Sequence, residues 1–197
     1  MGIKQIAKVG ILGGTFDPIH RGHLHIIESL ADRFDSIMVV PAGNPYMRSE
    51  KPEASGFDRV EMCTLALDNL SDALQEKVVL TDLEVRREGP TYAIDTIAQL
   101  KPFFPKDSFT LILGSDAASH FDKWHRADAL RKLVDVLVVR RPSETSAKSG
   151  FSEVEIDALD ISATKVREII ESGGNAEEFL TESVLEYIKE RGLYGSK

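Results

Sequence analysis

His20 and His23 stand three residues apart in the segment GILGGTFDPIHRGH, which combines glycine, hydroxyl and imidazole groups. Gly13 and Gly14 carry no side chain, so backbone amides there can approach a phosphate closely. Thr15 adds a hydroxyl, and two imidazoles spaced by three residues at a helix start lie on nearly the same side of the helix. Together these groups predict a binding site for a polyphosphate.

A strand and a helix must position these groups. The apolar run Val9 to Leu12 predicts a buried strand, which the two glycines end before Asp17-Pro18 turns the chain. Apolar residues then recur at helical spacing from Leu24 to Phe34. The segment is therefore a strand, a polar loop and a helix start, and the free N–H groups and positive dipole end of a helix start suit an anion.

The segment matches neither of the two commonest phosphate loops, GxxxxGK[ST] and GxGxxG. Two other interpretations remain open from the residues alone. One is an ordinary glycine-rich turn with incidental histidines, and the other is a metal site that uses His20 and His23.

The eleven residues from Gly13 to His23 resemble the GGTFDPxHxGH signature of the nucleotidyltransferases related to class I aminoacyl-tRNA synthetases. Within that group they look most like the bacterial nicotinate-nucleotide adenylyltransferases. The resemblance implies that His20 and His23 act in catalysis. It also implies ATP contacts from Gly13, Gly14, Thr15 and Phe16.

The segment DISATKVR, residues 160–167, is a second candidate for phosphate binding. Ser162 is placed as a helix N-cap, so the next backbone N–H groups are exposed. Arg167 could donate a bidentate pair of hydrogen bonds to phosphate. A capped amphipathic helix explains the segment equally well. It is similar to the ISSTxxR element of the same family, with Ala163 in place of a serine. The similarity implies ATP contacts from Ile161, Ser162 and Thr164 and a catalytic role for Arg167.

Gly114-Ser115-Asp116 resembles the GxD step of that family, which implies that Gly114 and Asp116 contact ATP, with Asp116 at the ribose or at a metal. A helix N-cap is the alternative for Asp116. Trp124 and His125 follow at a similar interval, and the resemblance implies that the indole stacks on the pyridine ring of the acceptor. A lone tryptophan is more often a core residue.

The segment GPTYAIDT, residues 89–96, resembles the GPSYTxDT run that holds the nicotinate carboxylate. The resemblance implies acceptor contacts from Thr91, Tyr92 and Ala93, through main-chain N–H groups at the last of these. Arg48 stands where the family has a lysine, and either cation could approach the acceptor phosphate.

The composition predicts one soluble globular domain over residues 1–197. Its formal net charge of −8 opposes generic nucleic-acid binding. No apolar run approaches the roughly 20 residues of a membrane span, and the first eight residues show no signal-peptide pattern. The single Cys63 is predicted to be a packing residue, and without a second cysteine the reducing cytoplasm is the expected location. A homo-oligomer stays possible.

Buried-type strand patterns alternate with helical patterns along most of the chain, which predicts a parallel sheet covered on both faces. The expected fold is a doubly wound, Rossmann-like α/β sheet with a small helical C-terminal part from about residue 160. The expected strands are 9–12, 36–40, 78–80, 109–113 and 135–139, with a short one at 153–157. The expected helices include 57–70, 93–100, 127–133, 162–171 and 181–191, and residues 143–152 are expected to form a loop.

The resemblance implies adenylyl transfer from ATP to nicotinate mononucleotide, with Mg²⁺ held mainly by the ATP phosphates. The attacking phosphate is already anionic, so no general base is needed. Pantetheine phosphate or nicotinamide mononucleotide are alternative acceptors, and the nicotinamide form is not excluded by sequence. A nucleotide-binding regulator without catalysis is a further alternative, whereas a tRNA-handling protein is disfavoured by the charge.

Overall fold

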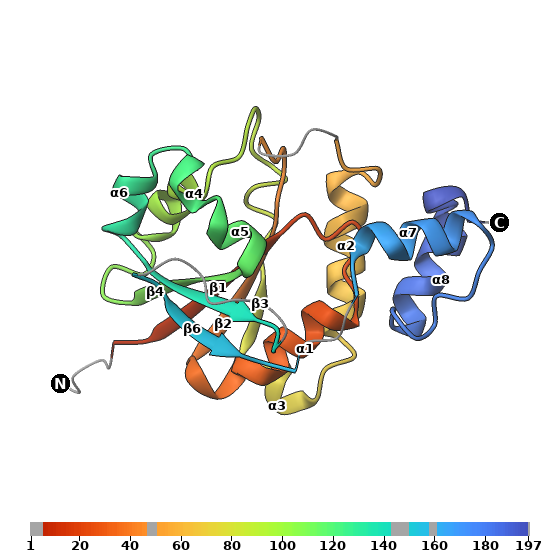
Figure 1. The fold of residues 1–197 in the computed structure, drawn as a ribbon, viewed down its shortest axis with the longest axis horizontal. Helices are drawn as coiled ribbons and strands as arrows, with labels where there is room; N and C mark the ends of the chain where they lie inside the picture. Colours follow the sequence, from red (N-terminus) through yellow and green to blue (C-terminus); the bar gives the residue numbers. More distant parts are fainter. Residues whose placement is uncertain (1–5, 47–50, 143–149, 158–160, 197) are drawn as a thin grey trace.

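Six parallel strands form the centre of the computed structural model, which describes residues 6–46, 51–142, 150–157 and 161–196 (Figure 1). Their order across the sheet is β3-β2-β1-β4-β5-β6. The strands are β1 (Lys8–Gly14), β2 (Ser36–Pro41), β3 (Val78–Leu80), β4 (Ser108–Gly114), β5 (Asp135–Arg140) and β6 (Ser152–Glu155). The predicted doubly wound parallel sheet is confirmed, and the strand order changes direction between the central neighbours β1 and β4.

Helices cover both faces of the sheet, with α4, α5 and α6 above it and α1 and α3 below it in the view of Figure 1. The helices of this part are α1 (Arg21–Leu30), α2 (Gly56–Leu67), α3 (Asp72–Gln75), α4 (Ala93–Leu100), α5 (Ser115–Ser119) and α6 (Ala127–Arg131). Short 3₁₀ turns follow α1 at Ala31–Arg33 and α5 at Phe121–Lys123. This two-sided cover is what the continuous apolar strands predict.

The core consists of two clusters of buried side chains, one on each face of the sheet. Ile112 belongs to the cluster that includes α1 and α2, whereas its neighbours Leu111 and Leu113 belong to the cluster that includes α4 and α6. Successive residues of a strand point to opposite faces, so each central strand contributes to both clusters. Cys63 is fully buried in the first cluster, as its apolar neighbours predict.

The C-terminal part comprises α7 (Ala163–Glu171), α8 (Glu182–Arg191) and a 3₁₀ turn at Leu193–Gly195, at one end of the molecule (Figure 1). It extends the first core cluster and packs on α2 through a buried acid. The Asp58 carboxylate accepts hydrogen bonds from the Tyr187 hydroxyl at 2.8 Å and from the Arg191 Nε at 3.1 Å. Ser55 caps α2 by accepting the Asp58 N–H, which is half of the capping box that the sequence predicts.

Several expected boundaries were wrong. The first strand does not stop at Leu12. It continues through Gly13 and Gly14, which pair with Val40 and Pro41. The second predicted helix ends at Leu67, three residues early, and the sequence did not indicate α3. Ser162 caps α7 as predicted, since its side chain accepts the Lys165 N–H. Arg48, Asp160 and residues 143–149 of the predicted loop lie outside the described residues.

We expect Asp58→Ala to lower the free energy of unfolding by roughly 1–3 kcal/mol, because the buried Asp58 carboxylate is the acceptor for Tyr187 and Arg191 on α8 and a cap partner of α2. Urea titration followed by circular dichroism measures the change. Asp82→Ala is the control, since Asp82 makes an exposed ion pair with Arg86 within one segment, and such pairs contribute little. Equal effects of the two substitutions would contradict the proposed anchoring of the C-terminal part.

Candidate active site

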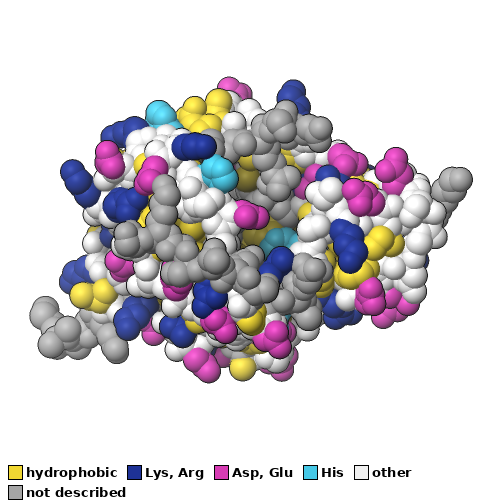
Figure 2. All heavy atoms as spheres, viewed as in Figure 1, with side chains coloured by type: hydrophobic (Ala, Val, Ile, Leu, Met, Phe, Trp, Pro, Cys, Tyr) yellow, Lys and Arg dark blue, Asp and Glu magenta, His cyan; other side chains and the backbone are white. Residues whose placement is uncertain are grey.

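Two adjoining cavities open beyond the carboxyl ends of β1 and β4, where the strand order changes direction. Figure 2 shows a hollow in this face, with hydrophobic and histidine side chains inside it. The larger cavity has a volume of about 530 Å³ and the smaller one about 200 Å³. Asp116 in the first turn of α5 lines both, so it marks their junction.

The predicted site residues divide between the cavities. Gly13, Gly14 and Thr15 line the larger cavity together with Thr91, Ala93 and Trp124. His20, His23, Gly114 and Ile161 line the smaller cavity. Thus the structure brings together segments that are up to about 150 residues apart in the sequence.

The loop between β1 and α1 is held in shape by the side chains around it. Phe16 adopts a left-handed backbone conformation, with φ of 51°, and its ring lies where any side chain on Gly14 would have to go. The buried Asp17 carboxylate accepts N–H groups of Glu53 and Ala54 and the Tyr194 hydroxyl, at 2.7–3.1 Å. Phe16 therefore supports the loop and lines neither cavity.

The two histidine rings are stacked, with centroids 3.8 Å apart and planes at 24°. The His20 backbone N–H donates to the Nδ1 of His23 at 3.2 Å, so a neutral His23 carries its proton on Nε2 and can donate it. The Nδ1 of His20 is buried and has no hydrogen-bond partner among the described residues. An unsatisfied buried polar atom in a cavity wall indicates a place for a polar ligand.

Burial lowers the pKa of both histidines. The pKa of His20 is lowered to about 4, mainly by loss of solvation and further by the positive charge of Arg141. The pKa of His23 lies well below its usual value because the ring is buried and His20 is adjacent. Both rings are therefore neutral near pH 7 and act as single N–H donors until an anion arrives.

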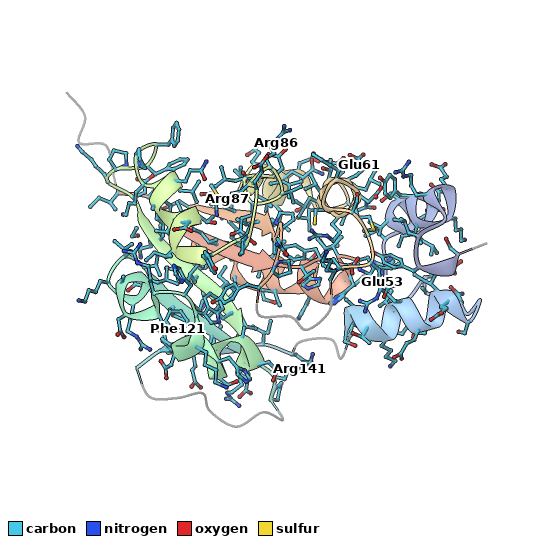
Figure 3. The ribbon with its side chains drawn as sticks, turned by 90° about the horizontal axis from the view of Figure 1, so that it is seen from above. Glu53, Glu61, Arg86, Arg87, Phe121 and Arg141 are labelled. Carbon is cyan, nitrogen blue, oxygen red and sulfur yellow. The ribbon has the colours of Figure 1, made fainter. Side chains whose placement is uncertain are left out.

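Arg167 lines neither cavity in this structure. Its guanidinium donates from Nη1 to the Asp17 carbonyl at 2.9 Å and from Nε to the Glu53 carboxylate at 2.5 Å. Figure 3 places Glu53 beside the C-terminal helices, between α2 and α7. Arg167 is thus bound to the glycine-rich loop itself, three residues before His20. Ser162 and Thr164 are exposed at the start of α7 and line neither cavity.

The predicted acceptor residues have different surroundings. The half-buried Trp124 stacks one face on Phe121, with centroids 5.2 Å apart, and also lines the larger cavity. Its stacking on the acceptor ring stays a prediction. Tyr92 and His125 line neither cavity; their rings stack on each other at 4.1 Å. The His125 backbone N–H also donates to the Tyr46 hydroxyl, which joins the Trp124 segment to the loop after β2.

Several residues of the cavity walls were missed by sequence reasoning. Arg141, which lines the smaller cavity, follows β5 directly, and the position after a strand was the signal that could have found it (Figure 3). Glu84, Thr96 and His120 line the larger cavity. Burial raises the pKa of the Glu84 carboxyl, which accepts the Thr96 hydroxyl at 2.6 Å. No local pattern marks these three residues.

The described residues that line the two cavities do not include the ligand set of a dedicated metal centre. Within the described ranges, no three His, Cys, Asp or Glu side chains are grouped as metal ligands. The exposed Asp116 carboxylate at the junction could supply an oxygen to a cation that is bound mainly by a ligand's phosphates. This arrangement fits Mg²⁺, which usually keeps one or two carboxylates and binds through substrate phosphates. In the described part of the chain, no helix is both long and apolar enough to cross a membrane.

Comparison with known proteins agrees with this geometry. The family described as cytidylyltransferase-like matches residues 11–169. A probable nicotinate-nucleotide adenylyltransferase of Dehalococcoides mccartyi is 35% identical over 202 residues, covering 95% of this chain and 97% of that protein. One of Oceanobacillus iheyensis is 36% identical over 193 residues, with the same coverage.

Among solved structures, the Plasmodium falciparum nicotinic acid mononucleotide adenylyltransferase complexed with NaAD superimposes with a TM-score of 0.83 at 21% identity. The match covers 96% of this chain and 98% of that one, which shows that the two share a fold. The sequence relatives share about a third of their residues with this chain over nearly its whole length. The chain therefore belongs to the nicotinate-nucleotide adenylyltransferase family, within the cytidylyltransferase-like group.

Proposed function

We propose that this protein transfers the adenylyl group of ATP to nicotinate mononucleotide and releases pyrophosphate, a step of NAD biosynthesis. The observation that carries the proposal is the pair of cavities that meet at Asp116. The smaller one holds the histidine pair of the signature loop, and the larger one holds the predicted acceptor residues Thr91, Ala93 and Trp124. Two substrates bound in adjoining cavities would react at the junction.

The reaction needs positioning more than acid–base chemistry. A phosphate oxygen of the mononucleotide attacks the α-phosphorus of ATP, a new P–O bond forms, and the bond from the α-phosphorus to the bridging oxygen of pyrophosphate breaks. The nucleophile is already an anion, so no residue has to remove a proton. Holding the two reactants in line and stabilising the developing charge supplies the rate.

The hydrogen-bond donors that stabilise this charge come from two elements, α1 and α7. At the start of α1 the two histidines offer ring N–H donors to the smaller cavity, next to the positive end of the helix dipole. Arg167 lies against the same loop, and phosphate could replace Glu53 as its partner. We propose that Ser162 and Thr164 contribute the backbone N–H groups of the α7 start, although neither lines a cavity. Mg²⁺, when bound, would supply further charge neutralisation at the phosphates.

The start of α4 is the proposed binding site for the carboxylate of the acceptor. Tyr92 is the N-cap of α4 and Ala93 its first residue, so main-chain N–H groups at this point are free to bind a carboxylate. A carboxylate accepts stronger hydrogen bonds than a carboxamide, which favours the nicotinate form over the nicotinamide form. Arg48 is proposed to reach the acceptor phosphate.

We propose that the protein is located in the cytoplasm, and the presence of a single cysteine supports this proposal.

The test is to incubate the purified protein with Mg-ATP and separately with nicotinate mononucleotide, nicotinamide mononucleotide and pantetheine phosphate. We expect the nicotinate dinucleotide and pyrophosphate as the main products, separated by chromatography. Trp124 is the one tryptophan of the chain, so its fluorescence should be quenched by the acceptor without ATP. Quenching without any product would favour the non-catalytic regulator, and a better nicotinamide substrate would overturn the acceptor assignment.

We expect His20→Asn and His23→Asn each to lower kcat/KM by roughly 100- to 1000-fold, the usual loss when one donor to a developing charge is removed. Steady-state kinetics with nicotinate mononucleotide measures the loss. His25→Asn is the matched control, because His25 lies on the same helix and lines neither cavity. Near wild-type kcat/KM in both site variants would contradict the assignment.

The His20 variant should also respond differently to pH. Because the folded-state pKa of His20 is about 4 and the usual value is 6.5, the unfolded chain binds more protons between these pH values. The histidine therefore lowers the free energy of unfolding as the pH falls from 6.5 towards 4, by on the order of 3 kcal/mol in total. His20→Asn should lose less stability than the wild type over this window, measured by urea titration.

For Arg167 we expect a graded loss of activity. Arg167→Lys keeps the charge but not the bidentate geometry of the guanidinium, so kcat/KM for ATP should fall clearly. Arg167→Ala should lower kcat/KM further. Glu53→Gln is the control, since it removes the ion pair and leaves the guanidinium in place. Wild-type ATP kinetics for Arg167→Ala would show that Arg167 serves only to hold α7 on the loop.

A further inference from the structure

Arg59 on α2 is a fully buried arginine, only 1% exposed. Its Nη1 donates to the Thr15 carbonyl at 2.6 Å, and its Nη2 donates to the Gly43 carbonyl at 3.3 Å. Thr15 follows β1 and Gly43 follows β2, so one guanidinium bonds to the loops after two neighbouring strands. Arg59 has no part in the proposed adenylyl transfer described above.

The backbone alone cannot join these two loops. The last backbone hydrogen bond between them runs from the Ala42 N–H to the Gly14 carbonyl at 2.8 Å. One residue further along each loop lie the carbonyl groups of Thr15 and Gly43. Both are hydrogen-bond acceptors, so they cannot bond to each other. A guanidinium has several donors in a fixed plane, so it can bind both carbonyls at once.

Each loop carries part of the proposed active site. Thr15 lines the larger cavity and precedes the histidine pair. Past Gly43, the Asn44 carbonyl accepts the Thr91 N–H at 3.0 Å, and Pro45 pairs with Thr91 in an isolated parallel bridge. The bonds of Arg59 therefore connect the ATP loop to the segment proposed to hold the acceptor, through Gly43 and its neighbours.

Gly43 has little freedom to move on its other side. A Cβ there would lie 2.0 Å from the Glu84 carbonyl oxygen, so the two backbone segments are in direct contact. The loop after β2 is therefore held between the Glu84 segment and the Arg59 guanidinium. Loss of the guanidinium would release the side that faces Thr15.

We propose that Arg59 is a positioning residue that sets the distance between the ATP loop and the acceptor loop, and thereby aligns the two reacting phosphates. The proposal rests on the proposed adenylyl transfer. Reacting groups must be within about 3–3.5 Å and aligned, and a misplacement of about 1 Å can cost on the order of 100-fold in rate. The ATP loop is also held by the bonds of Tyr194 and Arg167 to Asp17, so ATP binding alone should depend less on Arg59.

The experiment compares Arg59→Lys and Arg59→Met with Met62→Ala. Met62 is fully buried on the same helix, belongs to the core cluster and has no part in either cavity, so it controls for loss of stability. Folded fraction and melting temperature are measured by circular dichroism, ATP dissociation constants by calorimetry without acceptor, and kcat at saturating substrates. Wild-type product formation is scored first, because its failure would refute the proposed function and not the role of Arg59.

We expect kcat per folded molecule to fall roughly 10- to 100-fold in Arg59→Met, with partial recovery in Arg59→Lys, which can bond one carbonyl at a time. The ATP dissociation constant should stay close to the wild-type value in both. Met62→Ala should melt at a lower temperature and keep its kcat. Wild-type kcat in the folded Arg59 variants, or failure of both to fold at low temperature, would overturn the proposal and make Arg59 a residue of the fold alone.

Discussion

The direction change between β1 and β4 is the constraint on which the rest of the structure depends. Connections from β1 run to one side of the sheet and connections from β4 to the other, so no crossover covers the carboxyl ends of this central pair. The crevice left there receives the glycine-rich loop, the start of α5 and the start of α4. Its two cavities meet at Asp116 because α5 begins at the end of β4.

Anion binding in this protein has to be a local property, since its formal net charge is −8. The histidines are buried and neutral near pH 7, because burial lowers the pKa of each. Carboxylates such as Glu53 and Asp17 lie close to the same loop, and each is engaged with N–H groups or with Arg167. Backbone N–H groups, ring donors and guanidiniums are therefore the groups that can receive phosphate, whereas the overall field of the protein opposes it.

Hydrogen bonds from buried side chains tie the glycine-rich loop to the rest of the molecule. Arg59 bonds to the Thr15 carbonyl from α2, and Tyr194 bonds to the Asp17 carboxylate from the C-terminus. Arg167 bonds to the Asp17 carbonyl from α7. The loop follows a rigid central strand and is fixed from two sides, which is what a site that works by positioning requires.

The sequence by itself determined the parallel sheet and the signature loop, because both depend on local patterns. Apolar runs mark the strands, and Ser55 and Ser162 mark the starts of their helices through bonds to residues three positions away. Which of the predicted residues face a cavity was decided only by the tertiary structure. Tyr92 turns away from the cavity to stack on His125, and Arg167 is paired with Glu53, 114 residues away in sequence. Arg59 and Glu84 could not be recognised, because their positions depend on packing between distant segments, on which the local pattern of residues carries no information.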